Sequence, residues 1–151
     1  MKKIVTLVAV FFAAFAASAQ LNPVSWSYTA KKIADKTYEV HLTATIQSGW
    51  HLYSQTQPED AIAIPTGIKF TGNPLLSLEG GIKEVGKLEK FHDKKLALSA
   101  NQYSKKVDFV QVVKLKANAK TNVSGSIEYQ TCDDEKCLPP KTVKFSVAIE
   151  P

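Results

Sequence analysis

Arginine is absent from this chain of 151 residues, because all 19 of its basic residues are lysines. Arginine is the side chain that reads guanine and phosphate with two parallel hydrogen bonds, so its absence argues against a nucleic-acid partner. The lysines are scattered along the sequence, and we interpret the formal net charge of +5 as solubility. No internal repeat or biased tract is visible, which argues against collagen-like and disordered proteins.

Long apolar runs are lacking except near the amino terminus. Two lysines precede an apolar stretch over residues 4–16, and an Ala-Ser-Ala triplet follows it. This order is typical of a secretory signal peptide. The apolar stretch is shorter than the roughly 20 residues that span a bilayer, and no cysteine marks a lipoprotein cleavage site. We expect cleavage after Ala19, export to the periplasm or beyond, and a single domain over residues 20–151.

Cysteine occurs only twice, at Cys132 and Cys137, so a disulfide within the chain has one connectivity. In an exported protein such a pair is expected to be oxidised. A domain of this length buries enough surface to fold without a cross-link. The pair is therefore less suited to a role in stability alone.

Alternation of apolar and polar residues recurs along the chain and predicts half-buried β-strands. The clearest runs cover residues 24–28, 38–46, 123–129 and 143–149, with further candidates at 68–70, 96–99 and 107–115. Glycine and proline turn signals separate these runs, and residues 50–65 resemble a long loop with one helical turn around residues 57–61. About seven or eight short strands punctuated in this way indicate an antiparallel β-sandwich.

The two cysteines lie between the run that ends near Tyr129 and the run that begins near Thr142, which we expect to pair as a hairpin. Facing residues of antiparallel strands have Cα atoms about 4.5–5.5 Å apart, within the window of about 4.4–6.8 Å for a disulfide. A bridge between Cys132 and Cys137 is therefore sterically reasonable. A disulfide that closes a loop of about six residues stabilises the folded protein by only about 2 kcal/mol, whereas one that closes a loop of fifteen residues contributes about 3 kcal/mol.

Three roles for the pair remain open on these grounds. A disulfide at a hairpin tip is within reach of another protein's thiol, as redox exchange requires, whereas a structural disulfide would be inert. A zinc site would need two further ligands. The histidines, His41, His51 and His92, are far apart and lack ligand spacing, and His41 falls on the outward side of its strand, where we expect it to be solvated.

Acidic residues fill the loop between the cysteines. Nearby carboxylates disfavour a thiolate, so Asp133, Asp134 and Glu135 are expected to raise the pKa of the thiols. A polar turn also collects such residues without any effect on function. Two prolines that begin at Pro139 follow the second cysteine, and they either stiffen the chain there or guard a strand edge.

Residues 129–140 (YQTCDDEKCLPP) resemble the active-site hairpin of the amino-terminal periplasmic domain of the thiol:disulfide interchange protein DsbD. Residues 48–54 (SGWHLYS) are similar to the aromatic segment after an early strand of that family. Residues 86–93 (GKLEKFHD) are similar to the segment that follows the family's cap loop. The similarity extends in this order over essentially the whole chain after the signal peptide. Four residues separate the cysteines here, one fewer than in the best-known members.

The resemblance implies an immunoglobulin-like β-sandwich with a redox-active disulfide and no metal, flavin or nucleotide cofactor. It implies a thioredoxin-like protein or domain as reductant, supplied in turn by a membrane reductase, and oxidised periplasmic thiol proteins as acceptors. By position, Cys137 would form the mixed disulfide with partners and Cys132 would resolve it. His51 and Tyr53 match aromatic positions beside the active site.

The resemblance also places a cap loop, which would shield the sulfurs, at about residues 81–87. This stretch lacks the aromatic and acidic pairs expected there, and Phe91 is the candidate for the missing ring. The chain ends at Pro151, so it is either a free-standing domain that meets its reductant as a separate protein, which we favour, or a piece of a longer chain. The alternative function is a secreted immunoglobulin-like binding module with an inert structural disulfide.

Overall fold

Nine strands, joined by turns and loops, make up the part of the chain that the computed structural model describes, residues 21–95 and 97–151. The expected signal peptide, residues 1–19, lies outside the described residues. Within the described ranges, no helix is long and apolar enough to cross a membrane.

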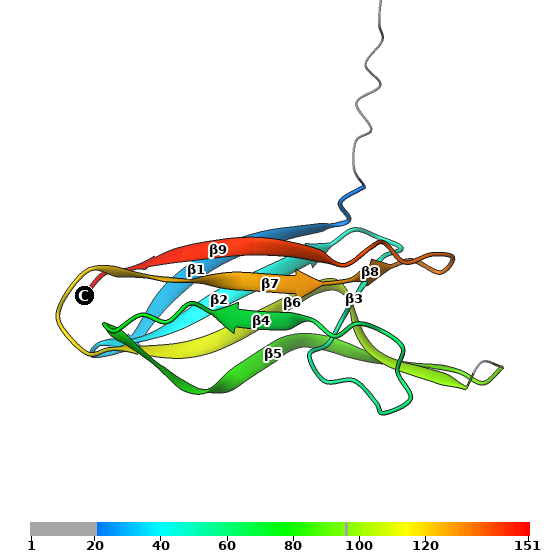
Figure 1. Ribbon diagram of the computed structural model, residues 1–151, viewed down its shortest axis with the longest axis horizontal. Coiled ribbons are helices and arrows are strands. Elements are labelled where there is room, and N and C mark those ends of the chain that lie inside the picture. Colours follow the sequence, from blue (N-terminus) through cyan, green and yellow to red (C-terminus); the bar gives the residue numbers. More distant parts are fainter. Residues whose placement is uncertain (1–20, 96) are drawn as a thin grey trace, which may run out of the picture.

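The strands form two antiparallel sheets that lie in two layers (Figure 1). The larger sheet has the order β1-β2-β6-β3-β8, with β5 paired to β6. Its strands are β1 (Val24–Ala34), β2 (Thr37–Ile46), β3 (His51–Tyr53), β5 (Leu76–Asp93), β6 (Leu98–Leu115) and β8 (Thr131–Cys132). The smaller sheet has the order β4-β7-β9, formed by β4 (Gly67–Phe70), β7 (Thr121–Tyr129) and β9 (Lys141–Ile149). The predicted all-β sandwich and the hairpin of β7 and β9 are therefore confirmed.

One hydrophobic core lies between the two sheets. Leu42 and Phe109 from the larger sheet and Ile127 from the smaller sheet are fully buried. The ring of Trp26 packs 6.0 Å from Phe109 and 5.4 Å from Tyr129, measured between ring centroids. Full burial of a side chain such as Leu42, Phe109 or Ile127 contributes about 1.5–3 kcal/mol to the stability of the fold. The core therefore accounts for the alternating pattern seen in the sequence, most clearly in β2, where buried and less buried residues alternate.

The segment predicted as a loop over residues 50–65 contains the short strand β3. Leu52 of β3 is fully buried in the core, and the strand pairs with β6 on one side and β8 on the other. The predicted helical turn at residues 57–61 is a single turn closed by the N–H of Ala61 and the carbonyl of Pro58, at 3.1 Å. A strand of three residues is too short to show alternation, so its partners far along the chain define it.

The cap loop predicted at residues 81–87 is wrong, because these residues belong to β5 and residues 83–86 among them pair with β6. β5 is an edge strand with most of its side chains exposed, which removes the alternation that marks a buried strand. Two register shifts interrupt its pairing with β6, one on each side of Glu84. His41 lies on the outward side of β2, as predicted, and remains partly exposed, and its Nδ1 also lies 2.7 Å from Oδ2 of Asp108.

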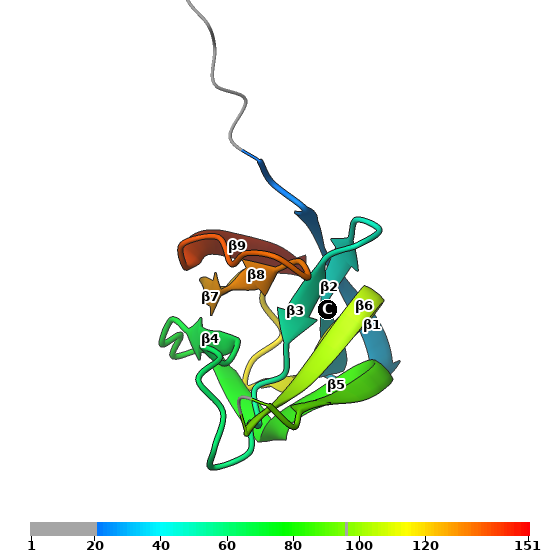
Figure 2. The ribbon, with the colours of Figure 1, turned by 90° about the vertical axis from the view of Figure 1, so that its right-hand side faces the viewer.

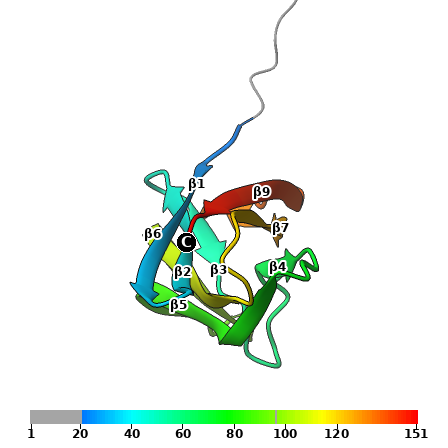
Figure 3. The same cartoon turned by 90° about the vertical axis from the view of Figure 1, so that its left-hand side faces the viewer.

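The chain changes sheets just before the first cysteine. Tyr129 ends β7 in the smaller sheet, and after Gln130 the next two residues form β8 in the larger sheet. There β8 lies beside β3 (Figure 2), where Thr131 pairs with Leu52 and Cys132 pairs with His51. This crossing ties the two sheets together at one end of the sandwich. The carboxyl terminus lies at the opposite end (Figure 1), which faces the viewer in Figure 3.

Gly125 in β7 leaves no room for a side chain. A Cβ atom at this position would lie 2.7 Å from Cζ and 2.9 Å from Cε1 of Phe145, and nearer still to the carbonyl oxygen of Lys69 in β4. We expect Gly125→Ala to lower the free energy of unfolding by about 2 kcal/mol, since overpacking a well-filled core costs about 1–3 kcal/mol. Urea denaturation followed by tryptophan fluorescence measures the change.

Gly72→Ala is the matched control, because a Cβ atom there meets nothing within 4 Å. Its free energy of unfolding should stay within about 0.5 kcal/mol of the unmodified protein. Equal denaturation midpoints for the two variants would contradict the close packing of β4, β7 and β9.

Candidate active site

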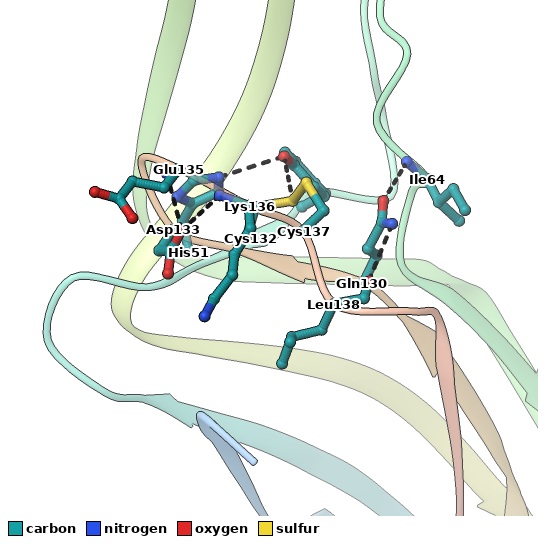
Figure 4. Close-up of a disulfide and its surroundings, with 10 residues drawn as sticks. His51, Ile64, Gln130, Cys132, Asp133, Glu135, Lys136, Cys137 and Leu138 are labelled. Atoms are coloured by element: carbon teal, nitrogen blue, oxygen red, sulfur yellow. Dashed lines mark hydrogen bonds between the residues drawn. A yellow bond between two sulfur atoms is a disulfide. The ribbon is translucent and has the colours of Figure 1, made fainter. Parts of the chain in front are cut away.

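Cys132 and Cys137 form a disulfide beyond the paired ends of β7 and β9, with their Cα atoms 4.0 Å apart (Figure 4). The two residues face each other as an antiparallel bridge, as the sequence predicted. The N–H of Asp133 donates to the carbonyl of Lys136, and the N–H of Leu138 donates to the carbonyl of Thr131, both at 2.9 Å. The disulfide therefore lies in a tight loop closed by backbone hydrogen bonds on both of its sides.

The two cysteines differ in exposure. Cys132 is only 2% exposed because it belongs to β8 within the larger sheet. Cys137 follows the turn and is exposed. Exchange depends on access to the sulfur that is attacked, so a thiolate from another protein meets Cys137 first.

Tyr53 contacts the buried sulfur. Its hydroxyl donates a hydrogen bond to Sγ of Cys132 at 3.0 Å, and Nε2 of His51 lies 3.3 Å from the same hydroxyl oxygen. His51 and Tyr53 are two residues apart in β3, so they share one face of the sheet, and Leu52 points to the core on the other. The pairing of His51 with Cys132 brings all three side chains together.

Burial and charge shift the pKa values of these groups. Burial raises the pKa of Tyr53, so its hydroxyl keeps its proton and remains a donor at neutral pH. Burial lowers the pKa of His51, and the negative charges of Asp134, Asp133 and Glu89 partly oppose that shift. His51 is therefore mainly neutral at pH 7.

The carboxylate of Asp133 is part of the loop structure. Its Oδ1 accepts hydrogen bonds from the N–H groups of Glu135 at 2.9 Å and Lys136 at 2.7 Å. These bonds favour the ionised form and lower the pKa of Asp133. A negative charge therefore stays beside the disulfide throughout the neutral pH range.

A cleft of about 750 Å³ lies beside the disulfide. Three segments from the same end of the sandwich surround it: the disulfide loop, the loop between β3 and β4, and the end of the β5–β6 hairpin (Figure 1). Apolar side chains contribute to its lining, and Ile62 and Phe91 among them are 78% and 49% exposed. The loop from Asp133 to Lys136 contributes charged side chains.

Most of the site residues proposed from the sequence line this cleft. They are His51, Tyr53, Phe91, Cys132, Asp133, Asp134, Glu135 and Cys137. Pro139 lies apart, in a second groove with Leu21 and Tyr129. No residue of the expected cap, residues 81–87, lines the cleft. The β5–β6 hairpin and the β3–β4 loop occupy its borders instead.

Sequence reasoning missed several residues of the cleft, which are Ile62, Ala63, Leu98, Ala100, Gln102 and Gln130. Gln130 links two of the segments: its Nε2 donates to the carbonyl of Leu138 at 3.2 Å, and its Oε1 accepts from the N–H of Ile64 at 3.5 Å (Figure 4). The one signal available in the sequence was the length of the β3–β4 loop, since long loops in compact domains are often functional.

Glu84 anchors the chain that follows Tyr53. Its Oε1 accepts from the N–H of Gln55, and its Oε2 accepts from the hydroxyls of Ser54 and Tyr103, all at 2.7 Å. The hydroxyl of Thr66 donates to the carbonyl of Tyr53 at 2.5 Å. These bonds hold the backbone on both sides of the β3–β4 loop, so the Tyr53 ring is fixed against Cys132.

No group of three or more His, Cys, Asp and Glu side chains in the described ranges is arranged to hold a metal ion. The two cysteines are bonded to each other, and His41 is paired with Asp108. The groups that the site offers for chemistry are therefore the two sulfurs, the Tyr53 hydroxyl and the His51 ring.

The sequence matches the family described as thiol:disulfide interchange protein DsbD, N-terminal, over residues 18–149. The chain belongs to this family. Its immunoglobulin-like sandwich is the fold of DsbD amino-terminal domains. Among curated proteins no sequence matches.

Solved structures of DsbD amino-terminal domains share this fold. The reduced DsbD domain of Neisseria meningitidis is 18% identical, with a TM-score of 0.51, covering 83% of this chain and 86% of that one. The amino-terminal periplasmic domain of ScsB from Proteus mirabilis is also 18% identical, with a TM-score of 0.50. That match covers 84% of this chain but only 45% of the ScsB chain. A structure of the complex between the DsbD and PilB amino-terminal domains of N. meningitidis gives 16% identity and a TM-score of 0.49, covering 86% and 88% of the two chains.

The difference in burial predicts different reactivity of the two thiols in the reduced domain. We expect iodoacetamide to modify Cys137 on the order of tenfold faster than Cys132, because reagent access limits a buried thiol. Trypsin cleaves after Lys136 and so separates the two cysteines into different peptides, which mass spectrometry quantifies.

Unfolding in urea serves as the control for alkylation, since the two rates should converge once burial is removed. Preferential modification of Cys132 in the folded domain would contradict the exposure described here.

Proposed function

We propose that this chain is a periplasmic thiol–disulfide exchange domain of the protein-disulfide reductase type. It relays electrons from a thioredoxin-like reductant to oxidised envelope proteins. The observation that carries the proposal is the asymmetry of the disulfide, in which Cys137 is exposed in a cleft and Cys132 is buried against a hydrogen-bond donor. Membership in the DsbD amino-terminal family supports it.

Reduction of the domain begins at Cys137. A thiolate of the reductant attacks Sγ of Cys137, the bond between the sulfurs breaks, and its electron pair passes to Sγ of Cys132. The product is a mixed disulfide between the reductant and Cys137. A second thiol of the reductant then attacks its own sulfur in that mixed disulfide. The reductant leaves oxidised, and the domain keeps two reduced cysteines.

The acceptor reaction uses the same sulfurs in reverse order. The thiolate of Cys137 attacks a disulfide of the acceptor and forms a second mixed disulfide. Cys132 then attacks Sγ of Cys137, which restores the internal bond and releases the reduced acceptor. Two electrons pass through the domain in each cycle, and two sulfurs are sufficient for the chemistry.

The surroundings of the disulfide favour these roles. The Tyr53 hydroxyl stabilises negative charge on Cys132 when this sulfur leaves. Asp133, Asp134 and Glu135 are expected to raise the pKa of the thiols, which protects the reduced domain from adventitious oxidation. The exposed Ile62 and Phe91 offer apolar surface to a docking protein.

Export completes the proposal. Residues 1–19 act as a cleaved signal peptide, and residues 20–151 form the mature domain in the periplasm. Support comes from the charged and apolar pattern at the amino terminus and from the periplasmic location of the related ScsB domain. A membrane reductase supplies the thioredoxin-like protein with electrons.

Redox titration of the Cys132–Cys137 couple tests whether the disulfide is exchanged. We expect a midpoint potential between about −180 and −270 mV, the range of thiol–disulfide exchange proteins. Equilibration with glutathione and dithiothreitol buffers, followed by thiol alkylation and mass spectrometry, measures it. A midpoint below about −300 mV would indicate a stable structural disulfide, and the protein would then be a binding module with an inert cross-link.

Trapping of partners tests the roles of the two sulfurs. Cys132→Ala leaves Cys137 able to attack an acceptor but removes the thiol that resolves the product. We expect this variant to accumulate mixed disulfides with periplasmic proteins, visible on non-reducing gels. Cys137→Ala is the matched control and should accumulate few. The reverse result would exchange the roles of the two cysteines.

A further inference from the structure

We propose that His51 is a positioning residue for the exchange reaction, acting on the buried sulfur of Cys132 through Tyr53. The tyrosine hydroxyl donates to Sγ, which leaves its oxygen able to accept, and we therefore assign the His51 proton to Nε2, which lies 3.3 Å from that oxygen. Protons move along this line to Cys132 when the disulfide opens and away from it when the disulfide forms again. The inference rests on the proposed function and deepens it.

Cys132 needs such a route because of its burial. When the disulfide opens, this sulfur receives an electron pair, yet the residue is 2% exposed and packs with Tyr53, Ala100 and Ala63. An unpaired thiolate in such surroundings is strongly disfavoured. Because the residue is almost fully buried, bulk water has little access to it, and the Tyr53 hydroxyl is the donor already in contact with its sulfur.

The hydrogen bonds between these side chains give the order of the groups. The Tyr53 hydroxyl lies 3.0 Å from Sγ and directs its hydrogen there, which leaves its oxygen as an acceptor. Nε2 of His51 is 3.3 Å from that oxygen, and the two rings meet edge to face with their centroids 5.4 Å apart. His51 is only half-buried and lines the cleft, so it connects the buried pair to solvent.

Proton and electron movements balance at each step. An attacking thiolate bonds to Sγ of Cys137, and the electron pair of the broken bond passes to Sγ of Cys132. The Tyr53 proton moves to this sulfur, and the Nε2 proton of His51 moves to the tyrosine oxygen. A protonated His51 is left neutral, whereas a neutral His51 takes a proton from water at Nδ1. Re-formation of the disulfide reverses these transfers.

Charged groups from two segments face or adjoin His51. Asp133 and Asp134 approach from the disulfide loop and Glu89 from β5, and all three raise the pKa of a ring that burial lowers. Glu135 and Lys136 line the same cleft. The protonated ring is a stronger donor to Tyr53 and adds positive charge near the leaving sulfur. Disulfide opening should therefore be faster below the pKa of His51.

Reduction by dithiothreitol measured from about pH 5 to pH 8 tests this inference, since a histidine titrates in that range. Acid quenching, alkylation and mass spectrometry give the rate constant, which is divided by the fraction of reagent thiolate at each pH. For the unmodified protein we expect this normalised rate constant to rise by about tenfold as the pH falls through the titration of His51. A change of this size corresponds to the free energy that a charge-assisted hydrogen bond contributes.

Variants of the two relay residues should change this profile in different ways. His51→Gln keeps a hydrogen-bond donor but does not titrate. Its normalised rate constant should therefore be independent of pH and close to the value that the unmodified protein has at high pH. His51→Phe and Tyr53→Phe should both be flat and about tenfold slower than the glutamine variant. Circular dichroism and urea midpoints check folding, and if the phenylalanine variants do not fold, the flat profile of His51→Gln decides the question.

Two controls separate the relay from general effects of charge. His92→Gln removes an exposed histidine whose Nδ1 lies 2.9 Å from the Ser99 hydroxyl, and it should keep the unmodified profile. Asp134→Asn removes a charge that raises the pKa of His51, so the inflection should move to lower pH and not disappear. A pH dependence that survives in His51→Gln would overturn the proposal.

The redox titration distinguishes failure of this inference from failure of the proposed function. If the relay is wrong, the midpoint potential of the disulfide still falls in the exchange range, and only the pH profile of the rate is lost. If the proposed function is wrong, the midpoint lies in the structural range for the unmodified protein and for every His51 variant.

Discussion

The pairing of Cys132 with His51, between β8 and β3, is the contact on which the site depends. It ties the β7–β9 hairpin of the smaller sheet to the larger sheet and places one sulfur inside the sandwich. The tight loop that follows returns the chain outward, so that the second sulfur is exposed. Tyr53, two residues beyond His51, then faces the buried sulfur because alternate residues of a strand share one face.

This asymmetry supports the different chemical roles that we propose for the two cysteines, although they belong to one bond. The exposed sulfur is open to attack, and the buried sulfur has a donor in place before the reaction starts. Such preorganisation is effective because no group has to reorganise when charge develops. The hydrogen bonds from Glu84 of β5 to Ser54 and Gln55 add to this preorganisation, since they hold the backbone that follows Tyr53. The site is thus a property of both sheets together.

Prediction from the sequence succeeded where one strand buries one face. β2, β7 and β9 show clear alternation because each has the core on one side, and the paired cysteines followed from the hairpin of β7 and β9. β3 and β5 escaped prediction for opposite reasons. β3 is too short to show a period, whereas β5 is long but lies at an edge, where its exposed side chains carry no alternating pattern. The cap assigned to residues 81–87 failed for this second reason.

The amino-acid sequence by itself determined the all-β class, the hairpin and the family, because these follow from local periodicity, turn residues and the motif around two cysteines. Which sulfur is buried, which hydroxyl meets it and which segments enclose the cleft were decided only by the tertiary structure. Tyr53 and Cys132 are 79 residues apart in the chain, yet they share a hydrogen bond. Contacts of this kind arise from strand pairing across the sheet, and pairing between distant strands leaves no local signal in the sequence.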